Sequence, residues 1–147
     1  SCRAGMTTTA TSRGDLMEKS AKQREFLLLS RGKWDADKPA EEIQKAIDEF
    51  YVWYEQLLAE GKFKPGHRLS TEGKLVSGFG VTDGPFTETK EVIGGYWFIV
   101  AESLEEAAAI AARSPCLACG LSYEIRPLEL ERATAWRVTN ETPLRST

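Results

Sequence analysis

The sequence predicts an α+β domain whose elements follow the order strand, helix, strand, strand, helix, strand. Two short runs, 25–30 and 96–100, are apolar at nearly every position, which is typical of strands buried on both faces. Two helical segments, near 39–60 and 103–113, follow these strands, and residues 121–128 then alternate between apolar and polar. This order is that of the ferredoxin-like split βαβ fold, in which the first and third strands of the sheet are central.

The first helix is expected to begin beside Asp37, whose side chain can cap it, with Pro39 in its first turn. Gly61 is expected to end it. Apolar residues recur between them at helical spacing: Ile43, Ile47, Phe50, Tyr54 and Leu57. The aromatic residues at positions 50, 51, 53 and 54 are interpreted as helix-to-sheet core rather than a stacking platform, and Trp53 is the one expected to lie outside the core.

The second strand is predicted over residues 62–70. Pro65 places it at an edge of the sheet, because proline cannot donate to a strand ladder. A small hairpin is expected around Ser77 and Gly78, and the run 83–86 (Asp-Gly-Pro-Phe) is typical of a turn.

The second helix opens with a capping box, in which Ser103 accepts a backbone N–H and Glu106 reaches back. Pro115 ends this helix. In the last strand, two sets of side chains are expected on opposite faces of the sheet. They are Leu121, Tyr123 and Ile125 on one side and Ser122, Glu124 and Arg126 on the other.

A dimer follows from this arrangement, because two helices can cover only one face of a sheet whose central strands are apolar on both. An apolar face of that size rarely stays in water. The simplest cover is a second copy of the sheet. We therefore predict a symmetric homodimer, a dimeric α+β barrel with a cleft between the facing sheets.

The composition fits one globular domain: 147 residues, 41% hydrophobic, 28% charged, with a net charge of −3. No basic excess points to direct nucleic-acid binding, and no apolar run is long enough to cross a membrane.

We expect a domain at 25–128, a flexible tail at 1–24 and an extension at 129–147 that packs loosely or crosses to a partner chain. Residues 1–5, before Met6, look like a cloning remnant. An odd, sparse set of cysteines and the lack of a signal-peptide pattern predict a cytoplasmic protein.

Seven short motifs lie between residues 66 and 127. They are 66–69 (Gly-His-Arg-Leu), 72–74 (Glu-Gly-Lys), 81–86 (Val-Thr-Asp-Gly-Pro-Phe), 90–91 (Lys-Glu), 93–96 (Ile-Gly-Gly-Tyr), 101–104 (Ala-Glu-Ser-Leu) and 124–127 (Glu-Ile-Arg-Pro). Together they resemble the YCII-related, or DGPF-domain, family over roughly residues 25–128. The resemblance implies a ferredoxin-like fold that dimerises as an α+β barrel, in agreement with the pattern of strands and helices.

The resemblance implies no single activity. Most members are uncharacterised bacterial proteins, and some are encoded beside extracytoplasmic-function sigma factors. One relative is a dehydrochlorinase of a chlorinated aromatic, and one branch uses a His–Asp pair. That branch places its histidine in the first helix, where this chain has none, and its aspartate before a proline, where this chain has Ser114. Chemistry of that type is therefore not expected here.

Two residues are candidates for catalysis. His67 is the only histidine and could act as a general base, or it could be a surface residue of an edge strand. Asp83 could act as an acid or base at the mouth of the cleft, or orient His67 or Arg68. Its other interpretation, which we favour, is an Asx-turn that fixes the following Gly-Pro.

A second set of residues is predicted to bind a ligand in the cleft: Arg68, Tyr96, Trp97, Glu124 and Arg126. Arginine forks bind carboxylates or phosphates at two points, and aromatic walls suit a small aromatic molecule. The alternative is that Glu124 and Arg126 pair with each other or across the dimer.

Cys116 and Cys119 form a Cys-x-x-Cys, but it follows the end of a helix instead of opening one. Zinc would need two further ligands, and Cys2 and His67 are the only other cysteine and histidine residues. Two small buried residues are the expected outcome, with no metal site and no cofactor.

Two functions remain open from the sequence. One is a dimer that binds a small anionic or aromatic molecule without turning it over. The other is a cofactor-free enzyme that uses Asp83, His67 and Arg68. An accessory role with a sigma factor, through protein contact, is a third hypothesis.

Overall fold

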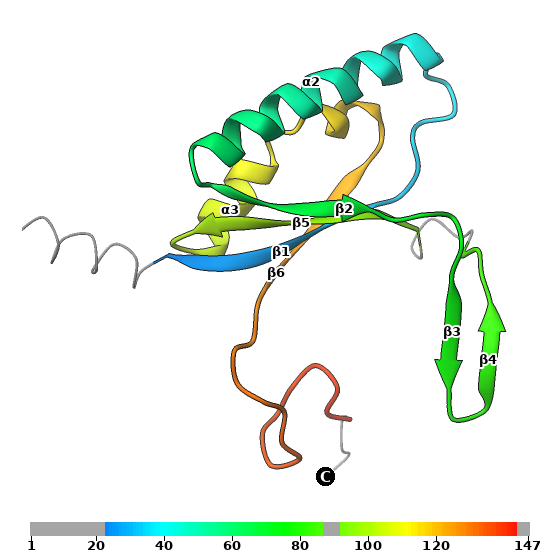
Figure 1. Cartoon of the computed structure of the whole chain (residues 1–147), viewed down its shortest axis with the longest axis vertical. Helices are drawn as coiled ribbons and strands as arrows, with labels where there is room; N and C mark the ends of the chain where they lie inside the picture. The colour runs from blue at the N-terminus through cyan, green and yellow to red at the C-terminus, as the bar shows by residue number, and fades with distance from the viewer. Residues whose placement is uncertain (1–22, 87–91, 144–147) are drawn as a thin grey trace, which may run out of the picture.

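A computed structural model describes residues 23–86 and 92–143 of the chain (Figure 1). The N-terminal tail predicted at 1–24, with its cloning remnant, lies almost wholly outside the described residues, as does the 90–91 motif. Four antiparallel strands form one sheet in the order β2-β5-β1-β6. They are β1 (Arg24–Arg31), β2 (Phe63–Arg68), β5 (Ile93–Ala101) and β6 (Ser122–Pro127). The central places of β1 and β5 and the edge places of β2 and β6 confirm the predicted ferredoxin-like topology.

The helices cover one face of this sheet. They are α2 (Ala40–Ala59), α3 (Leu104–Ala111) and the short 3₁₀ helix η2 (Pro115–Cys119). Every second residue of the central strands is buried beneath them, including Phe26, Leu28 and Ile99. The alternate residues, such as Leu27, Leu29 and Phe98, point to the other face and are only partly buried. We call this second side the open face.

Helix α2 begins differently from the prediction. Pro39 itself is the N-cap residue, and no side chain caps the helix, so Asp37 does not have the expected capping role. The helix ends at Glu60, and Gly61 follows with φ 75°, a left-handed conformation that favours glycine. Within the aromatic cluster, Phe50 is in the core and Trp53 packs edge-on against Phe63, with ring centroids 5.3 Å apart.

The prediction for the cluster was therefore wrong in one respect. Tyr51, and not Trp53, is the exposed member, because it lies further round the helix from the buried stripe of Ala46, Phe50 and Leu57.

The capping box of α3 is confirmed. The Glu106 N–H donates to Ser103 Oγ at 3.1 Å, and Glu106 Oε2 accepts from the backbone N–H of Glu102. Pro115 then opens η2 instead of a loop, with Ser114 as its N-cap. The two predicted faces of β6 are also confirmed, since Leu121, Tyr123 and Ile125 pack against the core.

Strand β2 contains a bulge that decides where its last residues point. Lys64 pairs with Phe98 and His67 pairs with Tyr96. Between these pairs the chain advances three residues along β2 but only two along β5, so β2 contains one extra residue. Gly66 makes this possible: a Cβ there would lie 1.8 Å from the Tyr96 carbonyl oxygen. A regular strand would place His67 under the helices, but the bulge places it on the open face and turns Arg68 toward the helices.

The predicted hairpin around Ser77 and Gly78 is confirmed as β3 (Lys74–Ser77) and β4 (Gly80–Asp83), which pair only with each other. This hairpin projects from the body on the side opposite to α2 (Figure 1). Residues 128–143 run out on the same side and form neither helix nor strand.

Candidate functional site

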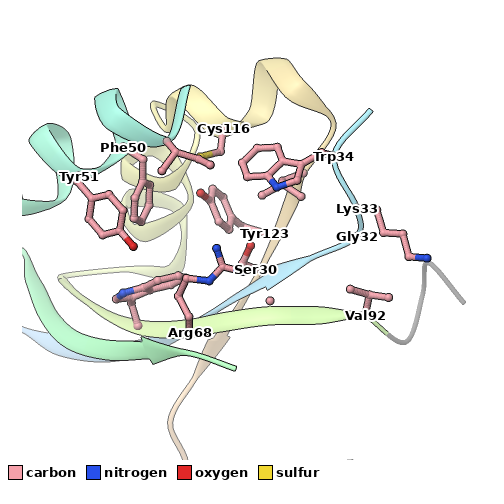
Figure 2. A pocket seen from close by; sticks show the side chains of 14 residues that line it. Ser30, Gly32, Lys33, Trp34, Phe50, Tyr51, Arg68, Val92, Cys116 and Tyr123 are labelled. Carbon is pink, nitrogen blue, oxygen red and sulfur yellow. The ribbon is translucent and has the colours of Figure 1, made fainter. Parts of the chain in front are cut away.

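A cavity of about 440 Å³ lies between α2 and the covered face of the sheet (Figure 2). Strands β1, β2, β5 and β6, the helix and the loop after β1 all contribute to it. The residues around it are Ser30, Gly32, Lys33, Trp34, Ile47, Phe50, Tyr51, Arg68, Val92, Gly94, Trp97, Cys116, Leu121 and Tyr123.

Arg68 supplies the main charge of this cavity. The bulge in β2 brings its guanidinium to the covered face, beside Ser30, as Figure 2 shows. Within the described residues, the side chain of Arg68 has no hydrogen bond and no ion pair, and the hydroxyl of Ser30 has no partner either. Both groups are therefore available to an incoming ligand.

Two glycines, Gly94 and Gly95, leave space in the cavity wall near Arg68 and Ser30. A Cβ at position 94 would lie 3.9 Å from both Arg68 Nη2 and Ser30 Oγ, so Gly94 lines the space between these groups and the strand. A Cβ at position 95 would lie only 2.7 Å from Cη2 of the Trp97 ring. Gly95 therefore lets the Trp97 indole lie back over the strand and form part of the cavity wall.

Aromatic rings form much of the remaining wall. Phe50 and Trp97 meet edge to face, with centroids 5.4 Å apart. Trp34 is held on the opposite side by the loop that carries it, because the Asp35 N–H donates to the Cys119 carbonyl at 2.8 Å. Gly120, at φ 102°, leaves room for this contact, since a Cβ there would lie 2.3 Å from Asp35 Oδ1.

A pair of hydroxyls lies near the inner part of the cavity. Tyr123 Oη and Ser114 Oγ are 2.7 Å apart, and Ser114 Oγ also accepts the Cys116 N–H at 3.3 Å. Burial raises the pKa of the Tyr123 phenol, and burial likewise raises the pKa of the Cys116 thiol. Both groups are therefore protonated at neutral pH and act as hydrogen-bonding groups rather than as nucleophiles.

The charge balance of the cavity favours an anion. Arg68 and Lys33 are cationic, and none of the described residues around the cavity is aspartate, glutamate or histidine. Cationic side chains beside aromatic walls match a small aromatic anion in both charge and shape.

The structure divides the predicted ligand-binding residues between the two faces of the sheet. Arg68 and Trp97 belong to the cavity under α2 and not to a cleft between facing sheets. Tyr96 lies on the open face, next to His67, with ring centroids 6.2 Å apart. Glu124 is also on the open face, between Arg31 and Arg126, at 3.1 Å from each. The predicted alternative, a pairing of Glu124 with Arg126, is therefore observed.

The three residues of the enzyme hypothesis are not brought together. Asp83 lies at the end of β4 in the projecting hairpin, exposed and paired with Lys74. His67 and Arg68 are neighbours in sequence but point to opposite faces. The Asx-turn interpretation is also not observed, because the Gly84 N–H donates to the Gly73 carbonyl at 2.6 Å.

The expectation for the cysteine pair is confirmed: Cys116 and Cys119 are both buried free thiols. Within residues 23–86 and 92–143, no group of three metal-ligating side chains occurs.

Several residues of the cavity were missed in the sequence analysis. The sequence patterns do not distinguish Trp34 or Ser30, and they place Tyr123 only on the same strand face as Leu121 and Ile125. One signal was present: a polar Ser30 and a Tyr123 hydroxyl at inward-facing strand positions need partners, and such residues often line a cavity.

The fold and this cavity define a ferredoxin-like domain with a cationic, aromatic-walled pocket between its first helix and its sheet. The chain belongs to the YCII-related domain family, whose model matches residues 24–129. A comparison with curated proteins found no match. No helix of the described residues is long and apolar enough to span a membrane.

Two solved structures are similar to the chain. One is 5-chloro-2-hydroxyhydroquinone dehydrochlorinase from Burkholderia phenoliruptrix AC1100 in complex with 2,5-dihydroxybenzoquinone. The two chains are 18% identical, the match covers 71% of this chain and 93% of the dehydrochlorinase chain, and the TM-score is 0.38. The other is a hydroxynitrile lyase from Passiflora edulis, which is 11% identical to this chain. The match covers 75% of this chain and 98% of the lyase chain, and the TM-score is 0.37.

Proposed function

We propose that this protein binds a small aromatic anion in the cavity under α2 and does so without chemical turnover. The observation that carries the proposal is Arg68, a cation with no partner among the described residues, placed by the β2 bulge in a cavity with aromatic walls. A carboxylate or phenolate on Arg68 would form a charge-assisted pair, and its ring would lie against Trp97.

Binding is favoured over catalysis by the groups around the cavity. General acid–base catalysis at neutral pH needs a group that exchanges a proton near that pH. The described residues of the cavity supply a guanidinium, an ammonium, phenols and a thiol, and the pKa values of the Tyr123 phenol and the Cys116 thiol are raised by burial. These groups hold and orient a ligand, and none of them is a ready proton acceptor.

The proposal includes a homodimer formed through the open face. The support for it is the row of apolar side chains there, including Leu27, Leu29 and Phe98, on a sheet whose other side is already covered. A cytoplasmic location is proposed as well, because Cys116 and Cys119 remain thiols in the fold.

The test uses benzoate as the anionic probe and benzyl alcohol as an uncharged probe of similar shape. Binding is followed by quenching of tryptophan fluorescence, since Trp34 and Trp97 lie at the cavity. Benzoate is expected to bind more tightly than benzyl alcohol. Arg68→Gln is expected to weaken benzoate binding about 10- to 100-fold, because a hydrogen bond to a charged group contributes about 1.5–3 kcal/mol.

The matched control is Arg126→Gln, which removes the same charge from the open face and is expected to leave benzoate binding unchanged. Equal losses in the two variants would mean that only net charge matters and would refute the assignment of the site. Equal binding of the charged and uncharged probes would refute the anion specificity.

A further inference from the structure

The exposed apolar residues of this protein are concentrated in two segments. Thirteen large hydrophobic residues are exposed among the described residues, and only three of them, Tyr51, Val52 and Leu104, lie on the helices. The other ten lie in residues 69–86 and 128–138. A distribution this uneven marks an interaction surface rather than the usual scatter of single apolar side chains.

The first segment contains the β3–β4 hairpin, which we call the arm. Its turn carries Phe79, whose relative exposure is 103%, and Val76 on β3 is 73% exposed. Leu75 and Val76 point to opposite faces of the arm, so both faces carry exposed apolar side chains. Among the described residues, β3 and β4 form a sheet of their own, and a lone two-stranded hairpin is only marginally stable in water, which favours a partner for the arm.

The second segment is the C-terminal extension, where Leu130 and Trp136 are more than nine-tenths exposed. The arm and this extension leave the body on the same side, away from α2 and α3 (Figure 1). That side is also the one to which the open face points. The arm, the C-terminal extension and the open face therefore all lie on the side of the sheet away from the helices.

The area of the open face alone is small for a stable dimer. Four strands spaced about 4.8 Å apart and six to nine residues long, at about 3.3 Å per residue, give a face of roughly 400–500 Å². A specific interface of standard size buries about 800 Å² on each partner. The sheet therefore supplies about half of what is needed, and the remainder must come from elements beside it.

We infer that the arm of each chain packs against a second copy of this chain and extends the sheet-to-sheet interface. The inference rests on the proposed dimer, and it adds a specific element to it: the exposed apolar side chains of β3 and β4 and of the turn at Phe79. The C-terminal extension lies on the same side and adds to the same contact.

The first experiment is sedimentation velocity over a dilution series of the full chain. The double variant Val76→Ser/Phe79→Ser is compared with Val52→Ser, which removes a similarly exposed valine from the outer surface of α2. The arm variant is expected to raise the dimer dissociation constant at least tenfold, and the Val52 variant is expected to leave it unchanged. Because Val76 and Phe79 are exposed and are not among the buried core residues, the arm variant retains the core.

The second experiment places the photo-cross-linker benzoylphenylalanine at position 79 in an equal mixture of ¹⁴N- and ¹⁵N-labelled protein. Cross-links that join a light chain to a heavy chain are expected, and mass spectrometry identifies them. A dimeric protein whose arm variant associates normally, with cross-links only within a chain, would overturn the arm contact and leave the dimer standing. A wild-type chain that sediments as a monomer of 16 kDa would overturn the dimer itself, while the benzoate test of the cavity is unaffected.

Discussion

Replacing Gly66 by alanine is expected to damage the domain and its cavity together. A Cβ at this position would lie 1.8 Å from the carbonyl oxygen of Tyr96 and 2.8 Å from the Cα of Trp97, both of them backbone atoms. A rotamer change cannot relieve such a contact. Since real Cβ atoms stay at least 3.0 Å from other atoms, β2 must move away from β5 by about 1.2 Å, the difference between 3.0 and 1.8 Å.

That movement breaks the hydrogen bonds next to the bulge. The Leu69 N–H, which donates to the Gly94 carbonyl at 2.9 Å, would pass beyond bonding distance. Two or three lost bonds at about 0.5–1.5 kcal/mol each, with some strain, give a loss of about 2–4 kcal/mol in the free energy of unfolding. At a urea dependence of about 2 kcal/mol per molar, the middle of the usual range, the midpoint of unfolding should fall by about 1–2 M.

Urea unfolding followed by tryptophan fluorescence measures this loss, and benzoate titration of the folded protein measures the effect on the cavity. Benzoate binding should weaken too, because the bulge is what directs Arg68 into the cavity. The control is Gly78→Ala, where a Cβ meets nothing within 4 Å. A Gly66→Ala protein as stable as the Gly78 variant, with normal benzoate binding, would refute the role given to the bulge.

Two further predictions concern the inner part of the cavity. In a double-mutant cycle, Ser114→Ala and Tyr123→Phe should each lower the free energy of unfolding by about 1–2 kcal/mol. The 2.7 Å hydrogen bond between the two hydroxyls should appear as a coupling energy of about 1 kcal/mol. Strictly additive losses would contradict that bond. Because burial raises the pKa of Cys116 above its ordinary value of 9.0, the unfolded chain loses this proton first as pH rises. The contribution of Cys116 to stability should therefore be constant below that pH and fall above it. In urea unfolding between pH 8 and 10.5, the wild type should lose stability more steeply than Cys116→Ala, and parallel curves would contradict the prediction.

The sequence was sufficient to predict the fold because each of its signals is local. Pro65 marked an edge strand, Ser103 and Glu106 marked a helix start, and the alternation after Gly120 marked the two faces of β6. Each of these depends on residues within a few positions of one another, and the predicted order of elements then leaves few topologies open.

The site was harder to predict because the faces of β2 depend on a contact between strands. The alternation of a regular strand gives one assignment for His67 and Arg68, and a single extra residue reverses it. The sequence shows Pro65 and Gly66, but not that both of them lie opposite the single residue Trp97 of β5. Arg68, predicted in the cleft between sheets, lies in the cavity under α2.

The same bulge explains why one short motif serves two surfaces. In 66–69, glycine allows the close approach to β5, histidine joins Tyr96 on the open face, and arginine enters the cavity. The two candidate interfaces of the protein, one for a ligand and one for a second chain, are thus back to back on the same pair of strands. A ligand on Arg68 lies on the opposite side of the sheet from the open face, so any influence on dimerisation would pass through the strands that line the cavity, β2 and β5 among them. Between β2 and β5, Gly66 is the position where the backbones lie too close for a side chain, so Gly66→Ala tests this pair of strands directly.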